Sequence, residues 1–207
     1  MTPLVIAHRG ASWELAENTL PAFERAIEEG ADFIEFDVHA ADGKLVVVHD
    51  VPRPGQGYPT LEEVLELATG RIGVMVELKR PHRYRRDDVV RRTLALLDDE
   101  AVLVCFEAGA LREAHRLRPC LRTLQHVGFG VSIARAARYA WAAGFYEPRT
   151  TPRGIARARA LGLETIVYTV NEPDRMRELA DLGVTGIVTD RPRLMRSTLA
   201  NRPPARD

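Results

Sequence analysis

Several features that mark specialised proteins are scarce or missing in this sequence. Its 207 residues include two cysteines and no Cys-x-x-Cys pair, which favours a reducing compartment over a disulfide scaffold. Neither sign of charge dominates, since 29 Lys and Arg balance 29 Asp and Glu, which argues against a nucleic-acid partner. No apolar run approaches the roughly 20 residues of a membrane span. The run Leu4–Ala7 is also too short for the apolar core of a signal peptide. We therefore expect a cytoplasmic protein without stable membrane insertion.

Apolar residues make up 45% of the chain and charged residues 28%, which is typical of a soluble globular protein. No internal repeat, low-complexity tract or inter-domain linker divides it. A chain of this length buries roughly 70% of the surface that its unfolded form exposes, so it needs no structural metal to fold. We expect one domain over residues 1–200 and a frayed Pro- and Arg-rich tail over 201–207.

Short apolar or β-branched runs alternate with longer amphipathic segments along the whole chain, a pattern typical of βα units around a parallel sheet. We expect eight strands, at Leu4–His8, Phe33–His39, Val74–Leu78, Val102–Phe106, Arg122–His126, Ala143–Tyr146, Thr165–Val170 and Gly186–Thr189. A short hairpin strand, Lys44–Val48, is expected after the turn Asp42-Gly43.

The segments between these strands carry apolar residues at helical spacing. The expected helices are Leu20–Glu29, Leu61–Thr69, Asp87–Leu97, Ala108–Leu117, Ser132–Ala142, Pro152–Leu161, Glu172–Leu182 and Pro192–Leu199. Eight strands, each followed by a helix, favour a closed (β/α)8 TIM barrel over an open doubly wound sheet. At 207 residues the barrel lies near the lower size limit of about 200, so we expect short loops and no cap domain.

Acidic residues gather where the second and third of these strands end, on the face where such barrels build their sites. Alternation along Phe33–His39 puts Glu35 and Asp37 on one face, and Glu77 ends the next strand. Three carboxylates at one barrel mouth need a counter-charge because unpaired buried carboxylates are costly. Their oxygens suit Ca²⁺, Mg²⁺ or Mn²⁺, so we expect one divalent metal ion there.

Histidines and cations flank these carboxylates. His8 and His49 end separate strand segments, which suits a general acid and a general base on opposite sides of a reacting centre. Arg9 and Lys79 add positive charge of the kind that grips a phosphate and neutralises its developing charge. The set indicates phosphoryl-transfer chemistry on an anionic phosphate ester.

In order and spacing, these residues closely resemble the signature of the glycerophosphodiester phosphodiesterase family. The matching segments are His8-Arg9-Gly10, Glu17-Asn18-Thr19, Glu35-Phe36-Asp37-Val38, His49-Asp50, Glu77-Leu78-Lys79, Tyr168-Thr169-Val170-Asn171 and Gly183–Pro192. They span nearly the whole chain, and a set this long is highly specific.

The resemblance implies a TIM-barrel enzyme that hydrolyses glycerophosphodiesters to glycerol 3-phosphate and an alcohol with bound Ca²⁺ or Mg²⁺. In that family the glycerol 2-hydroxyl attacks phosphorus, and water then opens the resulting cyclic phosphate. The residue roles that it implies are metal ligation by Glu35, Asp37 and Glu77, acid/base catalysis by His8 and His49, and phosphate contact by Arg9 and Lys79.

The sequence departs from the family at three places. Only Val51–Pro59 separates His49-Asp50 from the next helix, where members have a longer segment with an Arg-Thr-Thr-like motif, so we expect a reduced lid. Tyr168 stands where the family often has Trp and is expected to line the substrate pocket. Ala16 replaces the usual proline.

Other interpretations stay open. The open mouth and the basic run Lys79–Arg86 also suit lysophospholipase D activity on lysophospholipids, and a non-catalytic barrel that binds phosphoesters ranks lower.

Asn18 could cap the following helix while Glu17 orients Arg9. His39 is expected at the solvent-exposed rim. His82, His115 and His126 lack comparable company, and the substrate alcohol and the oligomeric state are not determined by the sequence.

Overall fold

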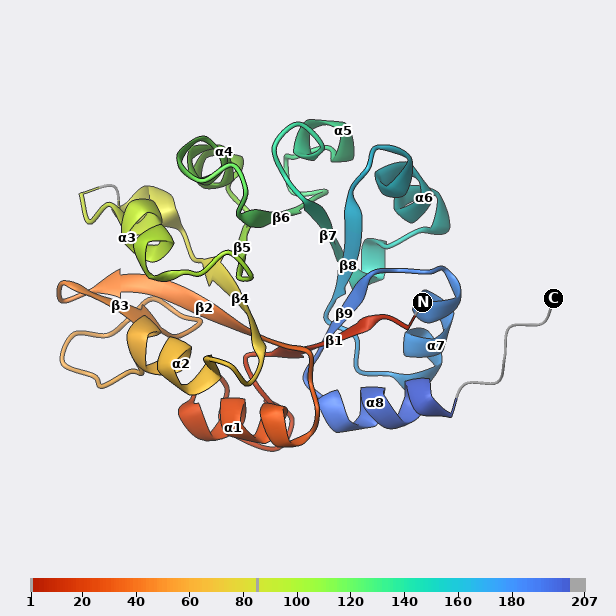
Figure 1. Ribbon diagram of the computed structural model, residues 1–207, viewed down its shortest axis with the longest axis horizontal. Coiled ribbons are helices and arrows are strands. Elements are labelled where there is room, and N and C mark those ends of the chain that lie inside the picture. The colour runs from red at the N-terminus through yellow and green to blue at the C-terminus, as the bar shows by residue number, and fades with distance from the viewer. Residues whose placement is uncertain (1, 85, 202–207) are drawn as a thin grey trace.

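Eight parallel strands close into a barrel in the computed structural model, which describes residues 2–84 and 86–201 (Figure 1). They are β1 (Leu4–His8), β2 (Phe33–Ala41), β4 (Gly73–Leu78), β5 (Val102–Cys105), β6 (Arg122–His126), β7 (Ala142–Tyr146), β8 (Glu164–Tyr168) and β9 (Gly186–Thr189). Their order is β1-β9-β8-β7-β6-β5-β4-β2, and a further pairing of β1 with β2 closes the ring. The short β3 (Lys44–Val47) pairs antiparallel with β2, as expected for the hairpin. The predicted TIM barrel is confirmed.

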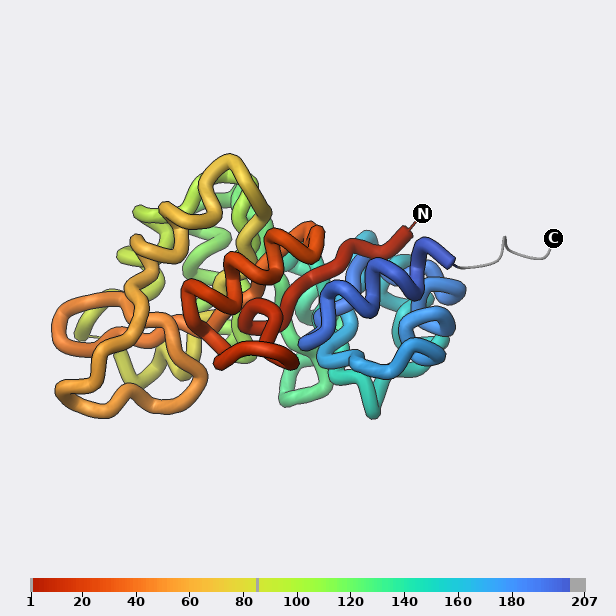
Figure 2. Tube along the Cα trace, turned by 90° about the horizontal axis from the view of Figure 1, so that it is seen from below, coloured from red at the N-terminus to blue at the C-terminus, as the bar shows by residue number. Residues whose placement is uncertain are grey.

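Helices follow the parallel strands and cover the outside of the barrel (Figure 1). They are α1 (Leu20–Glu28), α2 (Leu61–Ala68), α3 (Val89–Leu96), α4 (Ala108–Leu117), α5 (Ile133–Ala136), α6 (Pro152–Ala160), α7 (Pro173–Asp181) and α8 (Pro192–Ala200), with 3-10 turns η1 (Pro81–Tyr84) and η2 (Glu147–Arg149). Figure 2 shows the last helix beside the first strand, so the two ends of the described chain meet at the seam of the barrel.

The fifth helix is much shorter than predicted. We expected Ser132–Ala142, but α5 ends at Ala136 and Ala142 already begins β7. Side chains of β6 draw the intervening turn inward, since Thr123 Oγ1 donates to the carbonyl of Tyr139 at 3.2 Å. The Tyr139 hydroxyl also donates to Gln125 Oε1 at 2.8 Å. Backbone bonds continue as turns up to Ala140, whose N–H donates to the Ala136 carbonyl at 2.9 Å, and the two side-chain bonds hold this segment against β6.

Local signals set several of the other helix ends. Thr60 and Glu63 form a capping box at the start of α2. Gly30, Gly162 and Gly183 follow helices with φ of +74°, +77° and +71°, a conformation that favours glycine. No helix in residues 2–84 and 86–201 is long and apolar enough to cross a membrane. All but Asn201 of the expected tail at 201–207 lies outside the described residues.

Alternation along the strands divides the barrel interior into two layers. The lower layer is an apolar cluster of Ile6, Met75, Val102, Val104, Leu124, Ala142, Ile166 and Val188. One step of alternation further along the strands, polar side chains take the same inward positions, as in the pair Ile6 and His8 on β1. A larger apolar cluster fills the space between strands and helices. The polar layer therefore lies at the carboxyl ends of the strands, on a packed floor.

Candidate active site

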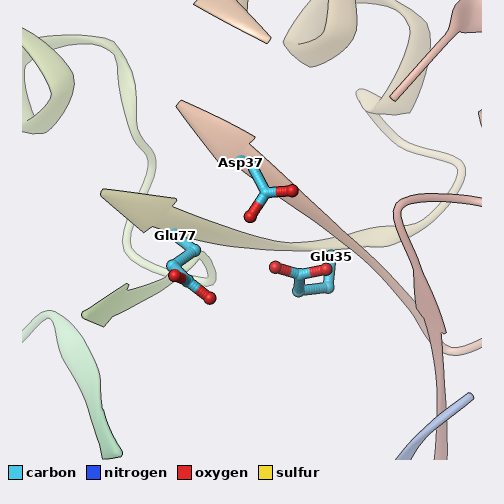
Figure 3. A group of neighbouring side chains, drawn as sticks. All are labelled: Glu35, Asp37 and Glu77. Carbon is cyan, nitrogen blue, oxygen red and sulfur yellow. The ribbon is translucent and has the colours of Figure 1, made fainter. Parts of the chain in front are cut away.

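The three predicted carboxylates meet in this polar layer. Glu35 and Asp37 extend from β2 and Glu77 from β4 toward a shared space (Figure 3). The strand register places Asp37 beside Glu77. Each side chain offers one oxygen within 4.8 Å of the others, and the residues are only 6%, 1% and 7% exposed. Burial of three like-charged groups so close together is unfavourable unless cations accompany them.

Two cations from the chain hold part of this cluster. Lys79 Nζ lies 2.8 Å from Glu77 Oε1 and 3.0 Å from Asp37 Oδ1. Arg9 Nε lies 3.1 Å from Asp37 Oδ2. Burial alone lowers the pKa of Lys79, but its two carboxylate partners raise it above the usual value. Lys79 therefore stays charged and links the ends of the neighbouring strands β2 and β4 through its two ion pairs.

The loop between β1 and α1 fastens onto Asp37 as well. Asn18 Nδ2 donates to Asp37 Oδ2 at 2.9 Å, and the Asp37 backbone N–H donates back to Asn18 Oδ1 at 3.3 Å. The expectation that Asn18 caps α1 is wrong, because Thr19 accepts from the backbone of Ala22 and Asn18 faces inward with φ of +56°. Glu17 accepts from Arg9 Nη1 at 2.8 Å, as predicted.

The electrostatics of the cluster leave it short of positive charge. Burial and then the neighbouring Asp37 raise the pKa of Glu35 to about 8. Burial also favours the neutral form of Glu77, but His126 and Lys79 together lower its pKa to about 2. Two cations face three carboxylates, and every offered atom is a carboxylate oxygen. This donor set fits a hard divalent cation such as Ca²⁺, Mg²⁺ or Mn²⁺.

His8 lies beside the cluster at the end of β1, oriented by a residue that sequence reasoning missed. Its Nδ1 lies 2.6 Å from Asp190 Oδ1, just after β9. Asp190 is held in turn by Asn171 Nδ2 at 2.6 Å and Ser12 Oγ at 3.0 Å. Burial lowers the pKa of His8, but the bond to Asp190 and the charge of Glu35 raise it overall. Asp190 also ends a strand, which is the signal that could have found it.

His49 follows β3 and faces a cleft of about 570 Å³ beside the carboxylates. Glu77, Lys79 and Arg53 also line this cleft. His49 Nδ1 lies 3.0 Å from Asp50 Oδ1 in a pair open to solvent.

The expectation of a solvent-exposed His39 is wrong, since this residue is 1% exposed. Its Nδ1 lies 2.7 Å from the Tyr84 hydroxyl and its Nε2 lies 3.2 Å from the His49 carbonyl oxygen. The turn η1 folds over the end of β2 and covers the ring, which alternation along a single strand does not reveal.

The other side of the mouth is aromatic. Tyr168, predicted to contact substrate, ends β8 and lies 6.2 Å, ring centre to ring centre, from Phe106 and 6.1 Å from Tyr146. Phe129 continues the surface, at 5.4 Å from Phe106 and 6.1 Å from Tyr146. Phe129 and Tyr146 are 44% and 40% exposed. These four residues, Phe106, Phe129, Tyr146 and Tyr168, form what we call the aromatic surface.

His126 is not isolated, contrary to the sequence-based expectation. Its Nε2 lies 3.4 Å from Glu77 Oε2, and its ring packs 4.1 Å from Phe106 and 4.2 Å from Tyr168. Alternation along β6 places His126 inside the barrel, as it does Leu124. This pattern could have predicted from the sequence that His126 lies near the site. His82 pairs with Glu107 at 2.5 Å, and both side chains are partly exposed.

Comparison with known proteins decides the family. The sequence pattern of the glycerophosphoryl diester phosphodiesterase family matches residues 8–62 and 51–194. The chain belongs to this family. A glycerophosphodiester phosphodiesterase of Caldanaerobacter subterraneus subsp. tengcongensis is 30% identical, over 93% of this chain and 96% of the relative.

Solved structures of similar proteins share the fold. The crystal structure of a glycerophosphodiester phosphodiesterase from Parabacteroides distasonis superposes with a TM-score of 0.86 at 29% identity, covering 97% of this chain and 98% of that one. A phosphodiesterase from Oleispira antarctica, solved in complex with its product sn-glycerol-3-phosphate, gives a TM-score of 0.84 at 21% identity, covering 97% and 98%. The predicted resemblance is confirmed, and so is the predicted enzyme class, a phosphoric diester hydrolase of the glycerophosphoryl diester phosphodiesterase family.

Proposed function

We propose that this member of the glycerophosphoryl diester phosphodiesterase family is a metal-dependent enzyme that hydrolyses glycerophosphodiesters to glycerol 3-phosphate and an alcohol. The observation that carries the proposal is the cluster of Glu35, Asp37 and Glu77 in the barrel mouth, with a histidine at each side. The product bound in the O. antarctica phosphodiesterase supports the assignment of glycerol 3-phosphate.

Glu35, Asp37 and Glu77 would hold the divalent ion. A metal ion of this kind polarises the phosphoryl oxygens and lowers the pKa of a coordinated hydroxyl. Lys79 and Arg9 already occupy one side of the cluster, which orients the carboxylates before the metal and the substrate arrive. Both cations also carry charge and N–H donors suited to the phosphate oxygens of the substrate.

His8 and His49 are proposed as the acid/base pair. Each has Nδ1 against an aspartate, Asp190 for His8 and Asp50 for His49, so Nε2 is the nitrogen left for proton transfer. One histidine would accept the proton of the attacking hydroxyl, and the other would donate a proton to the oxygen of the departing alcohol. Tyr168 would line the substrate pocket beside them.

The test is release of glycerol 3-phosphate from glycerophosphocholine and glycerophosphoethanolamine. The protein is assayed first with chelator and then with added Ca²⁺, Mg²⁺ or Mn²⁺. We expect no release with chelator and restored release with at least one ion. Chelator-resistant release would contradict the metal dependence, and no release with any ion would contradict the substrate assignment.

The aromatic surface favours lysophospholipids as a second candidate substrate class, through lysophospholipase D activity. Phe129 and Tyr146 present apolar area to solvent beside the carboxylates, where an acyl chain could lie. Faster turnover of a lysophosphatidylcholine than of glycerophosphocholine would support this candidate, and the reverse would contradict it. A cytoplasmic location stays a prediction to be measured.

A further inference from the structure

A further histidine of the mouth, His126, is buried without the bonds that buried polar groups need. The residue is 6% exposed, yet neither ring nitrogen has a hydrogen-bond partner among the described residues. His39, the other histidine buried in this region, has both ring nitrogens bonded. Because an unpartnered buried polar group costs stability, His126 calls for an explanation other than packing.

The surroundings of His126 hold its ring in one place. Phe106 and Tyr168 pack against it from two sides, at 4.1 and 4.2 Å between ring centres. On the neighbouring strand β7, a Cβ atom at Gly144 would come within 2.6 Å of His126 Nδ1 and of Leu124 Cδ2. The glycine is therefore what allows the ring to occupy this position inside the barrel.

The ring edge opposite Gly144 faces the carboxylate cluster. Nε2 lies 3.4 Å from Glu77 Oε2, just beyond the usual length of a strong hydrogen bond. Glu77 Oε1 is already bonded by Lys79 at 2.8 Å, so its two oxygens face two different nitrogen groups. Nδ1 faces the β7 backbone without an acceptor, so a neutral ring carries its proton on Nε2, toward Glu77.

We propose that His126 is a positioning residue that holds the Glu77 carboxylate, through Nε2–H, in the orientation that binds the divalent cation. The proposal rests on the proposed function, because it assumes that Glu77 is a metal ligand. Hydrogen bonds from neighbouring side chains commonly orient metal-binding carboxylates, and their removal typically weakens metal affinity about 10- to 100-fold. His126 links the metal cluster to the aromatic surface, since it contacts Glu77 on one side and two aromatic rings on the other.

Two substitutions separate positioning from packing. His126→Leu keeps similar volume and removes both unpartnered nitrogens, whereas His126→Gln keeps an N–H that can reach Glu77. The readouts are Mn²⁺ affinity of the full chain, measured by electron paramagnetic resonance of free Mn²⁺, and the midpoint of thermal unfolding without metal. We expect His126→Leu to bind Mn²⁺ at least about 10-fold more weakly with an unfolding midpoint no lower than wild type. His126→Gln should retain most of the affinity.

His39→Leu is the matched control, because it makes the same change at the buried histidine whose nitrogens are bonded. We expect it to lower the unfolding midpoint and to bind Mn²⁺ nearly as well as wild type. Unchanged Mn²⁺ affinity in His126→Leu would overturn the positioning role. So would a joint loss of affinity and midpoint in both His126 variants, which indicates packing alone. Absence of Mn²⁺ binding to the wild-type chain would overturn the proposed metal site itself and this role with it.

Discussion

The two halves of the barrel mouth are built on different physical principles. From β1 to β4 the strand ends carry charged groups, and each carboxylate of the cluster has a cation or an N–H within reach. From β5 to β8 they carry the aromatic surface, whose members meet mainly through ring edges and faces. There the Tyr168 hydroxyl is buried with no hydrogen-bond partner among the described residues. In the first half, the charged side chains are held in place before substrate binds. The second half offers apolar area against which part of the substrate can pack.

This contrast indicates that the charged half carries out the reaction and that the aromatic half selects the alcohol or acyl group of the substrate. Fixed charges and donors stabilise developing charge in a transition state. Aromatic area contributes binding that is roughly proportional to the apolar surface it covers. Substitutions in the two halves should therefore differ in kind, the first changing the rate for every substrate and the second changing the ranking of substrates.

The largest effect is expected for Asp37→Ala. Its carboxylate holds Arg9, Lys79 and Asn18, so its removal leaves two partly buried cations without their shared partner. We expect loss of activity together with about 3 kcal/mol of unfolding free energy, the scale of a broken buried ion pair. Urea unfolding and glycerol 3-phosphate release measure the two losses.

Glu35→Gln is the comparison for that experiment. It should also abolish activity while leaving the free energy of unfolding close to wild type, because no described cation lies within ion-pair distance of Glu35. Equal destabilisation by both substitutions would show that the cluster acts as one structural unit.

The next effect is expected for His8→Ala, which should lower kcat on the order of 10²-fold or more as a lost general acid or base. Asp190→Asn should lower kcat less, because His8 remains but loses the carboxylate that orients its ring. Steady-state kinetics on glycerophosphocholine measure both. A wild-type rate for His8→Ala would move the proton transfer to another group.

The smallest effect is expected on the aromatic surface. Phe129→Ser removes exposed apolar area and no member of the carboxylate cluster, so kcat/KM for glycerophosphocholine should stay unchanged. For a lysophosphatidylcholine it should fall roughly fivefold, since the partial burial lost amounts to about 1 kcal/mol. Arg149 stacks over Phe129, and Arg149→Gln serves as a control for the charge at this position. An equal fall of kcat/KM for both substrates in Phe129→Ser would contradict the distinction between the two halves.

Much of the architecture follows from sequence patterns that act locally. Strand β1 and strand β9 have the predicted bounds, because apolar runs flanked by turn residues define them. The residues of the carboxylate cluster were also predictable, since period-2 alternation fixes which side chains of β2 face inward. These signals need only a few neighbouring residues.

What the sequence did not reveal depends on contacts between distant segments. The helix after β6 stops early because Thr123 and Gln125 bond the following turn. His39 is buried because Tyr84, 45 positions later, covers it. Asp190 meets His8 only because the barrel closes between its first and last strands. No pattern within one segment contains this information.

The space that Gly144 leaves for His126 has a consequence for how such sequences can vary. A Cβ atom at position 144 would come within 2.6 Å of both His126 Nδ1 and Leu124 Cδ2, so two side chains of β6 require glycine there. Across relatives we expect glycine at the position of Gly144 wherever large side chains occupy the positions of Leu124 and His126, and a smaller residue at only one of them should not release that requirement. Position 144, which lies 18 residues after His126 in the chain, should therefore vary together with both of these residues and not with His126 alone.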